Sequence, residues 1–185
     1  MRVPSSVGPA EFLDWEAMQP DDVRHELLGG EILAFGQGAT QEHNELALRT
    51  IEFVRARKRP ECRAFAGMQR VRAGDDLTYP DIVLTCDERD VRAEDRTQIR
   101  YPKLIVEVLS PTTAAVDLIR KRRTYEKIET LEEYLVVDSR ERYAALFRRT
   151  GPVLREATQQ YDGTIVLDSL GAALDLGALY AGVLD

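Results

Sequence analysis

Short runs of aliphatic residues, separated by polar turns, alternate along the chain with longer segments that have one apolar side. Runs of roughly four to eight residues that are rich in Val, Ile and Leu are typical of strands, and segments with one apolar side are typical of helices. The alternation predicts an α/β fold.

Four segments carry the apolar side or the capping residues of helices: residues 9–15, 40–58, 110–129 and 176–183. The first has Pro9 in its first turn, where proline is tolerated. The second stops before Pro60, which cannot continue a helix. The third begins at Ser110-Pro111-Thr112-Thr113, whose hydroxyls can cap it.

The predicted strands lie between these helices. The Gly29-Gly30 pair separates two runs within residues 25–35 and predicts a hairpin. The stretch from Asp87 to Arg100 is almost wholly polar and is expected to be an exposed loop. Further strands are predicted at residues 63–71, 77–85, 103–109, 133–138, 143–148, 153–158 and 165–171, with an additional antiparallel hairpin toward the C-terminus.

Length and composition favour one domain. The chain has 185 residues, of which 44% are hydrophobic and 31% are charged, and no linker divides it, so we expect a single domain over residues 1–185. No apolar stretch reaches the length of a membrane span, and Met1 to Ser6 lack the apolar core of a signal peptide. We therefore expect a cytoplasmic protein without a membrane partner.

The two cysteines, Cys62 and Cys86, fall in predicted strands and have neither a CxxC nor a Cys/His spacing. Free cysteine is among the most buried residue types. We therefore expect two reduced core residues rather than a disulfide or a zinc site.

The formal net charge of −7 argues against indiscriminate nucleic-acid binding, which depends on clustered Lys and Arg. Two basic clusters are nevertheless present, at residues 55–59 and at residues 120–123 with Lys127 beyond. An ordinary solvated helix face accounts for the first cluster. The second is the stronger candidate for a function.

Two apolar runs each contain one acidic residue. Asp81 lies within residues 79–84, and Glu107 lies within residues 104–110. An ionised carboxylate among buried aliphatic residues is costly unless it is paired or binds a metal. Two such acids in neighbouring strands therefore point to one shared cation, and Mg²⁺ suits hard oxygen ligands. The alternative is that each acid ends a strand and is solvated.

Lys121 follows Glu107 by 14 residues (121 minus 107), across a short Ser-Pro connection. A helix that leaves a strand in this way returns over the sheet, so Lys121 can face the two acids. An ammonium there would orient an attacking water and stabilise negative charge on a phosphoryl oxygen. The alternative is a surface lysine in a basic helix.

A set of short motifs runs through nearly the whole chain. Its members are His25 to Ile32, Gln41-Glu42-His43, Tyr79 to Val83, Val106 to Thr113, Asp117 with Lys121 and Tyr125, Glu133 to Asp138, Asp168 to Gly171 and Leu179 to Gly182. In this order they resemble the Uma-two family, a group of restriction-endonuclease-like domains in the PD-(D/E)XK nuclease superfamily. Each motif is weak alone, but the ordered set is specific.

The resemblance implies a restriction-endonuclease-like α/β core, with a central mixed sheet that is flanked by helices and extended by an antiparallel hairpin. It also assigns roles to residues within this core. Asp81 matches the aspartate of the superfamily motif and Glu107 its second acid; together with the carbonyl of Val108 they would hold the metal. The motif would place a lysine at position 109, where this chain has Leu109. In this family the lysine is taken to have moved to the following helix, and Lys121 matches it.

Two further residues enter the candidate site through the resemblance. His43 matches a family histidine near the start of the first core helix, with a structural histidine as the alternative. Glu31 flanks the Gly-Gly turn, as does Glu26, and the family pattern keeps both acids. Glu31 could supply another metal ligand or hold Lys121, although hairpin glutamates mostly face solvent.

The preferred function is therefore an endonuclease that hydrolyses DNA phosphodiester bonds with Mg²⁺ or Mn²⁺, in which Lys121 positions the attacking water. The alternative is a binding or assembly protein that keeps the nuclease fold without cleaving, in line with the acidic net charge. We expect DNA as the partner, and a homodimer because nucleases that cut two strands are often dimers.

Overall fold

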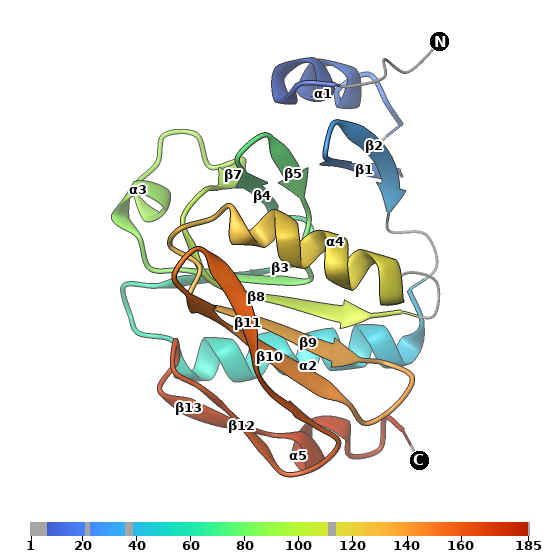
Figure 1. The fold of residues 1–185 in the computed structure, drawn as a ribbon, viewed down its shortest axis with the longest axis vertical. Helices are drawn as coiled ribbons and strands as arrows, with labels where there is room; N and C mark the ends of the chain where they lie inside the picture. Colours follow the sequence, from blue (N-terminus) through green and yellow to red (C-terminus); the bar gives the residue numbers. More distant parts are fainter. Residues whose placement is uncertain (1–6, 21–22, 36–38, 111–113, 185) are drawn as a thin grey trace.

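Two β-sheets pack against helix α4 (Ala114–Glu126) in the computed structural model, which describes residues 7–20, 23–35, 39–110 and 114–184. In Figure 1, α4 lies between the upper sheet and strand β8 of the lower one. The upper sheet has the order β2-β1-β5-β4-β7. Its strands are β1 (Arg24–Leu28), β2 (Glu31–Phe35), β4 (Arg70–Ala73), β5 (Asp76–Thr78) and β7 (Gln98–Ile99).

The lower, central sheet has the order β11-β10-β9-β8-β6-β3. Strands β8 and β9 are parallel and the other pairs are antiparallel, so the sheet is mixed, as the sequence predicts. Its strands are β3 (Arg63–Ala66), β6 (Ile82–Thr85), β8 (Pro102–Leu109), β9 (Glu133–Asp138), β10 (Ala144–Thr150) and β11 (Val153–Gln160).

The remaining elements pack on the ends and on one face of the assembly of two sheets and α4. Helix α1 (Pro9–Glu16) packs on the upper sheet, and α2 (Gln41–Arg57) packs on the face of the central sheet that is opposite α4. The single strand predicted at residues 165–171 is instead a hairpin of β12 (Thr164–Leu167) and β13 (Ala172–Asp175), and α5 (Leu176–Tyr180) follows it. Most predicted helices therefore form within a few residues of the expected bounds.

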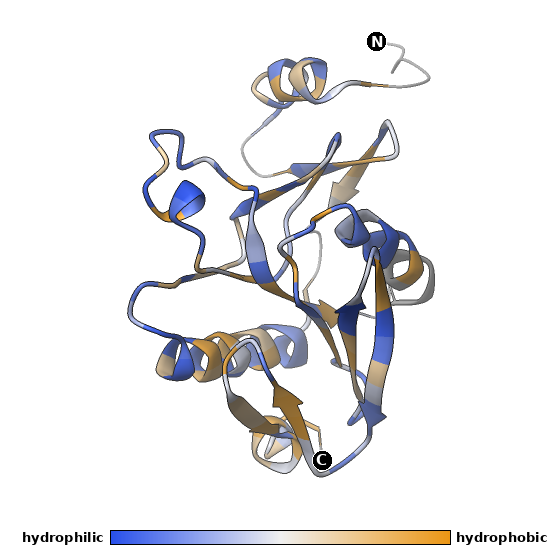
Figure 2. Ribbon diagram, turned by 60° about the vertical axis from the view of Figure 1, so that its left-hand side comes forward, coloured by the Kyte–Doolittle hydropathy of each residue, from blue (hydrophilic) through white to orange (hydrophobic). Residues whose placement is uncertain are grey.

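Alternation along the central strands decides which side chains face α4. Ile82 and Val106 belong to the core under α2, whereas Val83 and Ile105 belong to the core under α4. Since successive side chains of a strand point to opposite faces, Glu107 shares the α4 face with Ile105. Figure 2 shows the result as apolar strands and an apolar side of α2, with a hydrophilic segment around α3 (Glu88–Val91).

Two predicted strands are each divided in the structure. The predicted strand 63–71 forms β3 and β4, and the predicted strand 77–85 forms β5 and β6, because the chain passes from one sheet to the other in between. The crossing is marked by Gly67, which has a φ of +76° and donates its N–H to the carbonyl of Asp81 at 2.8 Å. A positive φ favours glycine, and this backbone conformation ends the extended segment of β3 at Gly67.

The predicted loop 87–100 contains a short helix and a strand. Asp87 caps α3 by accepting a hydrogen bond from the Arg89 N–H, and β7 pairs in parallel with β4. Four helical and two extended residues are too few to produce a hydrophobic period, so the sequence gives no sign of either. The predicted capping residues Pro111 to Thr113 lie outside the described residues.

The expectation of two reduced cysteines is wrong, because Cys62 and Cys86 form a disulfide with their Cα atoms 4.1 Å apart. The antiparallel register of β3 and β6 explains the pairing. Arg63 is opposite Thr85, so the next residues outward, 62 and 86, face each other as well. Neither a CxxC nor a Cys/His spacing is needed when two strands bring distant residues together.

No helix in the described part of the chain is long and apolar enough to cross a membrane. The cytoplasmic location stays a prediction, and so does the single domain over residues 1–185.

Candidate active site

Asp81 and Glu107 lie on adjacent central strands on the α4 side of the sheet. The register of β6 and β8 pairs Ile82 with Val106, so Asp81, which directly precedes β6, comes opposite Glu107. The backbone N–H of Val108 donates to Asp81 Oδ2 at 2.7 Å. This bond fixes the Asp81 carboxylate at the strand that carries Glu107.

Helix α4 brings a lysine and a tyrosine to Glu107. Lys121 Nζ lies 3.1 Å from Glu107 Oε1, and the Tyr125 hydroxyl donates to the same oxygen at 2.6 Å. Residues four apart share one side of a helix, so both side chains reach Glu107, whereas Arg120 contacts the β1–β2 hairpin and Arg122 lies over Phe147 of β10. The structure thus places the Lys121 ammonium against Glu107, as predicted.

Glu26 completes the surroundings of Lys121. Its Oε1 lies 3.3 Å from Lys121 Nζ and accepts the Tyr79 N–H at 2.9 Å, and the residue is only 4% exposed. The family pattern treats Glu26 and Glu31 alike, but the sequence holds a signal that separates them: Glu26 precedes the buried Leu27 and Leu28 in the same way as Asp81 precedes Ile82.

Glu31 does not reach Lys121. It pairs instead with Arg120 at 2.7 Å, and its side chain is 65% exposed. The suggestion that Glu31 holds Lys121 is therefore corrected, since Glu26, on the other strand of the hairpin, makes that contact. The hairpin itself forms as predicted, with Gly29 and Gly30 at φ values of +60° and +81°.

His43 joins the site from the first turn of α2. Thr40 caps that helix by accepting the His43 N–H at 3.2 Å, which sets the direction of the imidazole. Its Nε2 lies 3.4 Å from Asp81 Oδ1, and this contact raises the pKa of His43 against the opposing effect of burial. We call Glu26, His43, Asp81, Glu107 and Lys121 the acidic centre.

Burial and charge set the protonation of the acidic centre. Burial raises the pKa of Glu107 to about 7; Lys121 opposes the rise, while the nearby Asp81 and Glu26 add to it. Burial works against the Lys121 charge, but Glu107 and Glu26 outweigh it and hold the pKa of Lys121 above its ordinary value. Glu107 and Glu26 share the one ammonium of Lys121, and Asp81 contacts His43 instead, so the three carboxyl groups outnumber the one lysine.

The donor set of the acidic centre fits a hard divalent cation. Carboxylate oxygens are the ligands that Mg²⁺ and Mn²⁺ prefer, and a cation would offset the excess negative charge. Two buried polar atoms nearby, His43 Nδ1 and the Tyr134 hydroxyl, have no hydrogen-bond partner among the described residues. Water or an ion's hydration shell would satisfy them.

The described residues contain no group of three or more His, Cys, Asp or Glu side chains arranged to hold a metal. An ion held by Asp81 and Glu107 would therefore need backbone or water oxygens in addition. The structure shows the N–H of Val108 against Asp81, and the Val108 carbonyl as a ligand stays a prediction.

Comparison with known families gives one match over most of the chain. The model of the Uma2 family, described as "Putative restriction endonuclease", matches residues 9–177. This range includes every residue of the acidic centre.

Similar proteins are found among curated sequences and solved structures. The uncharacterized protein slr1290 of Synechocystis sp. is 32% identical over 183 residues, covering 96% of this chain and 93% of the relative. The uncharacterized protein sll1609 of the same organism is 27% identical over 132 residues, covering 70% and 73%. A crystal structure from Anabaena variabilis, titled as a "putative nuclease belonging to DUF820", superimposes with a TM-score of 0.77 at 19% identity and covers 96% of this chain and 99% of that one. The likeness in structure shows a shared α/β fold.

Proposed function

Since this chain belongs to the Uma2 family of restriction-endonuclease-like proteins, we propose that its acidic centre hydrolyses DNA phosphodiester bonds with Mg²⁺, or with Mn²⁺ in its place. The observation that carries the proposal is the convergence of Asp81, Glu107 and Lys121 from two adjacent strands and the helix that returns over them. A nuclease needs carboxylates for the cation and a positive group near the attacked phosphate.

Each residue has a distinct part in this proposal. Asp81 and Glu107, with the Val108 carbonyl, would hold the metal, which supplies charge neutralisation at the phosphate and a more acidic bound water. Lys121 would position the attacking water, and Glu26 would hold the Lys121 ammonium in place. His43 would orient Asp81 through the contact between its Nε2 and Oδ1.

A second candidate function rests on a different observation. Oε1 of Glu107 already accepts hydrogen bonds from Lys121 and Tyr125, so part of the acidic centre is satisfied without a cation. A protein that keeps the nuclease fold for binding or assembly would be stable with such a closed network. The two functions differ in whether a metal activates cleavage.

A cleavage assay on DNA and RNA with Mg²⁺ or Mn²⁺ tests the proposal. We expect the wild type to cut DNA, and Glu107→Gln to abolish cutting while the far-UV circular dichroism stays unchanged, because the amide keeps the shape but removes the charge. Lys121→Ala should lower the rate by about 10² to 10³, the usual loss for one well-placed electrostatic group, without preventing metal binding.

Two outcomes would contradict hydrolysis by this centre. The absence of cutting by the wild type on every substrate with either metal would favour the binding function. Cutting that survives Glu107→Gln would place the activity at another site or in a contaminating enzyme.

A further inference from the structure

Helix α4 presents a row of basic side chains on the side away from Glu107. Arg120 and Arg123 are three residues apart and share one side of the helix, Lys121 lies on another, and Lys127 directly follows the last helical residue. Arg120, Arg123 and Lys127 line a hollow of about 560 Å³ between α4 and the turn at Gly29. The row begins beside the acidic centre, since Arg120 directly precedes Lys121.

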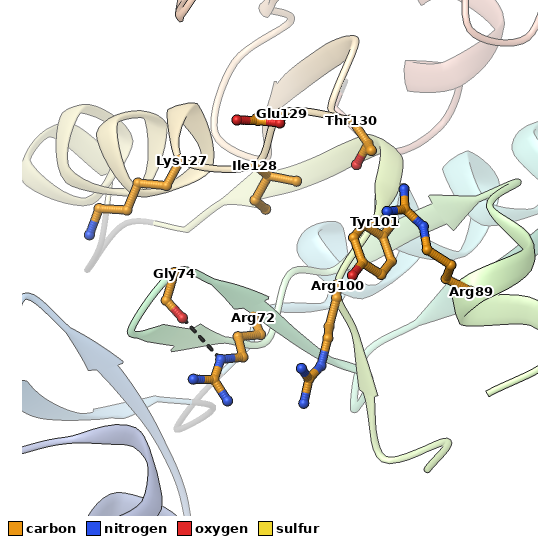
Figure 3. Close-up of a pocket in the computed structure, with 9 residues that line it drawn as sticks. All are labelled: Arg72, Gly74, Arg89, Arg100, Tyr101, Lys127, Ile128, Glu129 and Thr130. Atoms are coloured by element: carbon orange, nitrogen blue, oxygen red, sulfur yellow. Dashed lines mark hydrogen bonds between the residues drawn. The ribbon is translucent and has the colours of Figure 1, made fainter. Parts of the chain in front are cut away.

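A second hollow, of about 230 Å³, continues the row at the end of α4. Lys127 lines both hollows, and Arg72 of β4 and Arg100 before β8 join it in the second. Figure 3 shows the Arg72 and Arg100 side chains extending in the same direction from their separate segments, with Glu129 the one acid among the labelled residues. We call Arg72, Arg100, Arg120, Arg123 and Lys127 the basic track.

The charges of the basic track are available to a ligand to different degrees. Among the described residues, Arg100 and Arg123 form no ion pair. Arg120 pairs with the exposed Glu31, and such exposed pairs contribute little energy, so a phosphate can replace the partner. Lys127 is held more firmly, at 2.5 Å from the buried Asp76. In a chain of net charge −7, this concentration of positive charge is local.

We propose that the basic track binds the phosphate backbone of duplex DNA that extends from the acidic centre toward the end of α4. The proposal rests on the proposed function for its substrate class. From Glu107 back to Tyr101 the extended β8 spans about 20 Å at about 3.3 Å per residue. That length corresponds to about six steps of 3.4 Å along a DNA strand, which matches several phosphate contacts.

The aromatic residue of the track region favours a duplex over a single strand. Proteins that bind single strands stack the bases on exposed aromatic rings. One face of the Tyr101 ring is covered by the Arg89 guanidinium, 3.6 Å from the ring centroid. Arg89 is in turn held by Asp87 at 2.6 Å. The track therefore offers positive charge to a backbone, and little stacking surface to a base.

DNA binding can be measured apart from cleavage. Fluorescence anisotropy of a labelled duplex in EDTA, titrated between about 50 and 200 mM KCl, reports affinity and its salt dependence. The test variant is Arg100→Gln/Arg123→Gln, which removes the two unpaired charges without leaving a buried acid. The matched control is Arg59→Gln/Arg155→Gln, which changes the net charge equally at exposed positions outside the track.

We expect the test variant to bind about 10 to 100 times more weakly at about 0.1 M salt and to lose about 2 from the slope of log K against log salt. The control should stay within about twofold of the wild type. Equal affinities of the two variants would overturn the proposal, as would tighter binding of single-stranded DNA or RNA than of the duplex.

The outcomes separate this inference from the proposed function. If the wild type cuts DNA but both variants bind alike, the basic track is wrong and hydrolysis by the acidic centre stands. If the test variant alone binds weakly and no metal supports cutting, the track stands and hydrolysis fails. A wild type that binds no DNA overturns the track.

Discussion

Glu26 and Glu31 belong to the same hairpin, yet only one of them reaches the acidic centre. Glu26 is buried against Lys121, whereas Glu31 is exposed and pairs with Arg120. The two glutamates therefore form a matched pair for testing. We expect Glu26→Gln to lower the rate of metal-dependent cleavage by about tenfold or more, because Lys121 loses one of its two anionic partners.

Glu31→Gln should leave that rate within about twofold, since exposed ion pairs contribute little. Rates measured under single-turnover conditions, with circular dichroism to confirm folding, compare the two variants. Equal losses of rate in the two variants would show that the hairpin acts as a whole. A Glu26→Gln rate equal to that of the wild type would remove Glu26 from the mechanism.

If Glu107 holds the metal as proposed, its raised pKa would make metal binding depend on pH. Below a pH of about 7 the carboxyl holds a proton, and that proton competes with Mg²⁺. The increase in melting temperature caused by Mg²⁺ should therefore be large near pH 8 and shrink as the pH falls through about 7. Scanning fluorimetry with and without Mg²⁺ measures it, and Glu107→Gln should abolish it at every pH.

The same group affects stability without metal, in the opposite direction. The folded-state pKa lies above the ordinary value of 4.5, so the folded protein binds more protons than the unfolded chain between about pH 4.5 and 7. Its free energy of unfolding should fall as the pH rises through that window.

For the measurement with metal, an increase in melting temperature by Mg²⁺ that stays constant from pH 6 to 8 would contradict the assignment of Glu107 as a ligand.

At the residue scale, the proximity of Asp81, Glu107 and Lys121 could be predicted from the sequence. A carboxylate within an apolar run is a strong local signal, and the helix after β8 must return over the sheet. The choice between Glu26 and Glu31 could not be made in the same way. It depends on which side of the hairpin faces α4, and that is set by the packing of two sheets.

At the scale of elements, the helices other than the short α3 were predictable from the sequence. The two points at which the chain crosses from one sheet to the other were not. The predicted strand 77–85 is buried almost throughout, so its two halves look like one run, and the predicted strand 63–71 has no polar turn strong enough to divide it. Gly67 and Pro80 mark the crossings, yet either residue also occurs in bulges and strand ends. Only the register of β3 and β6 shows why Cys62 meets Cys86.

The disulfide between Cys62 and Cys86 should contribute measurably to stability. It closes a loop with a sequence separation of 24, and closing a loop of that size removes about 3 kcal/mol of chain entropy from the unfolded state. We expect a reducing agent to lower the urea midpoint of the wild type. Cys62→Ser/Cys86→Ser should show the lower midpoint with or without reductant, and a wild type that is insensitive to reductant would contradict the pairing.

At the scale of the whole molecule, Asp76 connects the upper sheet to α4. Its carboxylate accepts the Gly29 N–H at 2.7 Å and the Thr124 hydroxyl at 3.1 Å, and it pairs with Lys127. Only 3% of Asp76 is exposed. Since Glu26 of the upper sheet also holds Lys121, the acidic centre requires the two sheets to stay together.

The single tryptophan, Trp15, allows a test of whether the two sheets unfold together. It lies in α1, and its ring centroid is 4.7 Å from that of His25 in the upper sheet. In urea, Trp15 fluorescence and far-UV circular dichroism of the wild type should change at one midpoint, as for a cooperative domain. Asp76→Ala should cost about 1 to 3 kcal/mol, because the Gly29 N–H and the buried Thr124 hydroxyl lose their acceptor. In this variant the Trp15 fluorescence should also change at a lower urea concentration than the far-UV circular dichroism. Asp75→Ala, at a neighbouring side chain that is 90% exposed, should change the stability by less than about 0.5 kcal/mol. Separate midpoints in the wild type would instead show that the upper sheet unfolds as a domain of its own, and the contacts of Glu26 and Lys121 would then have to form between domains.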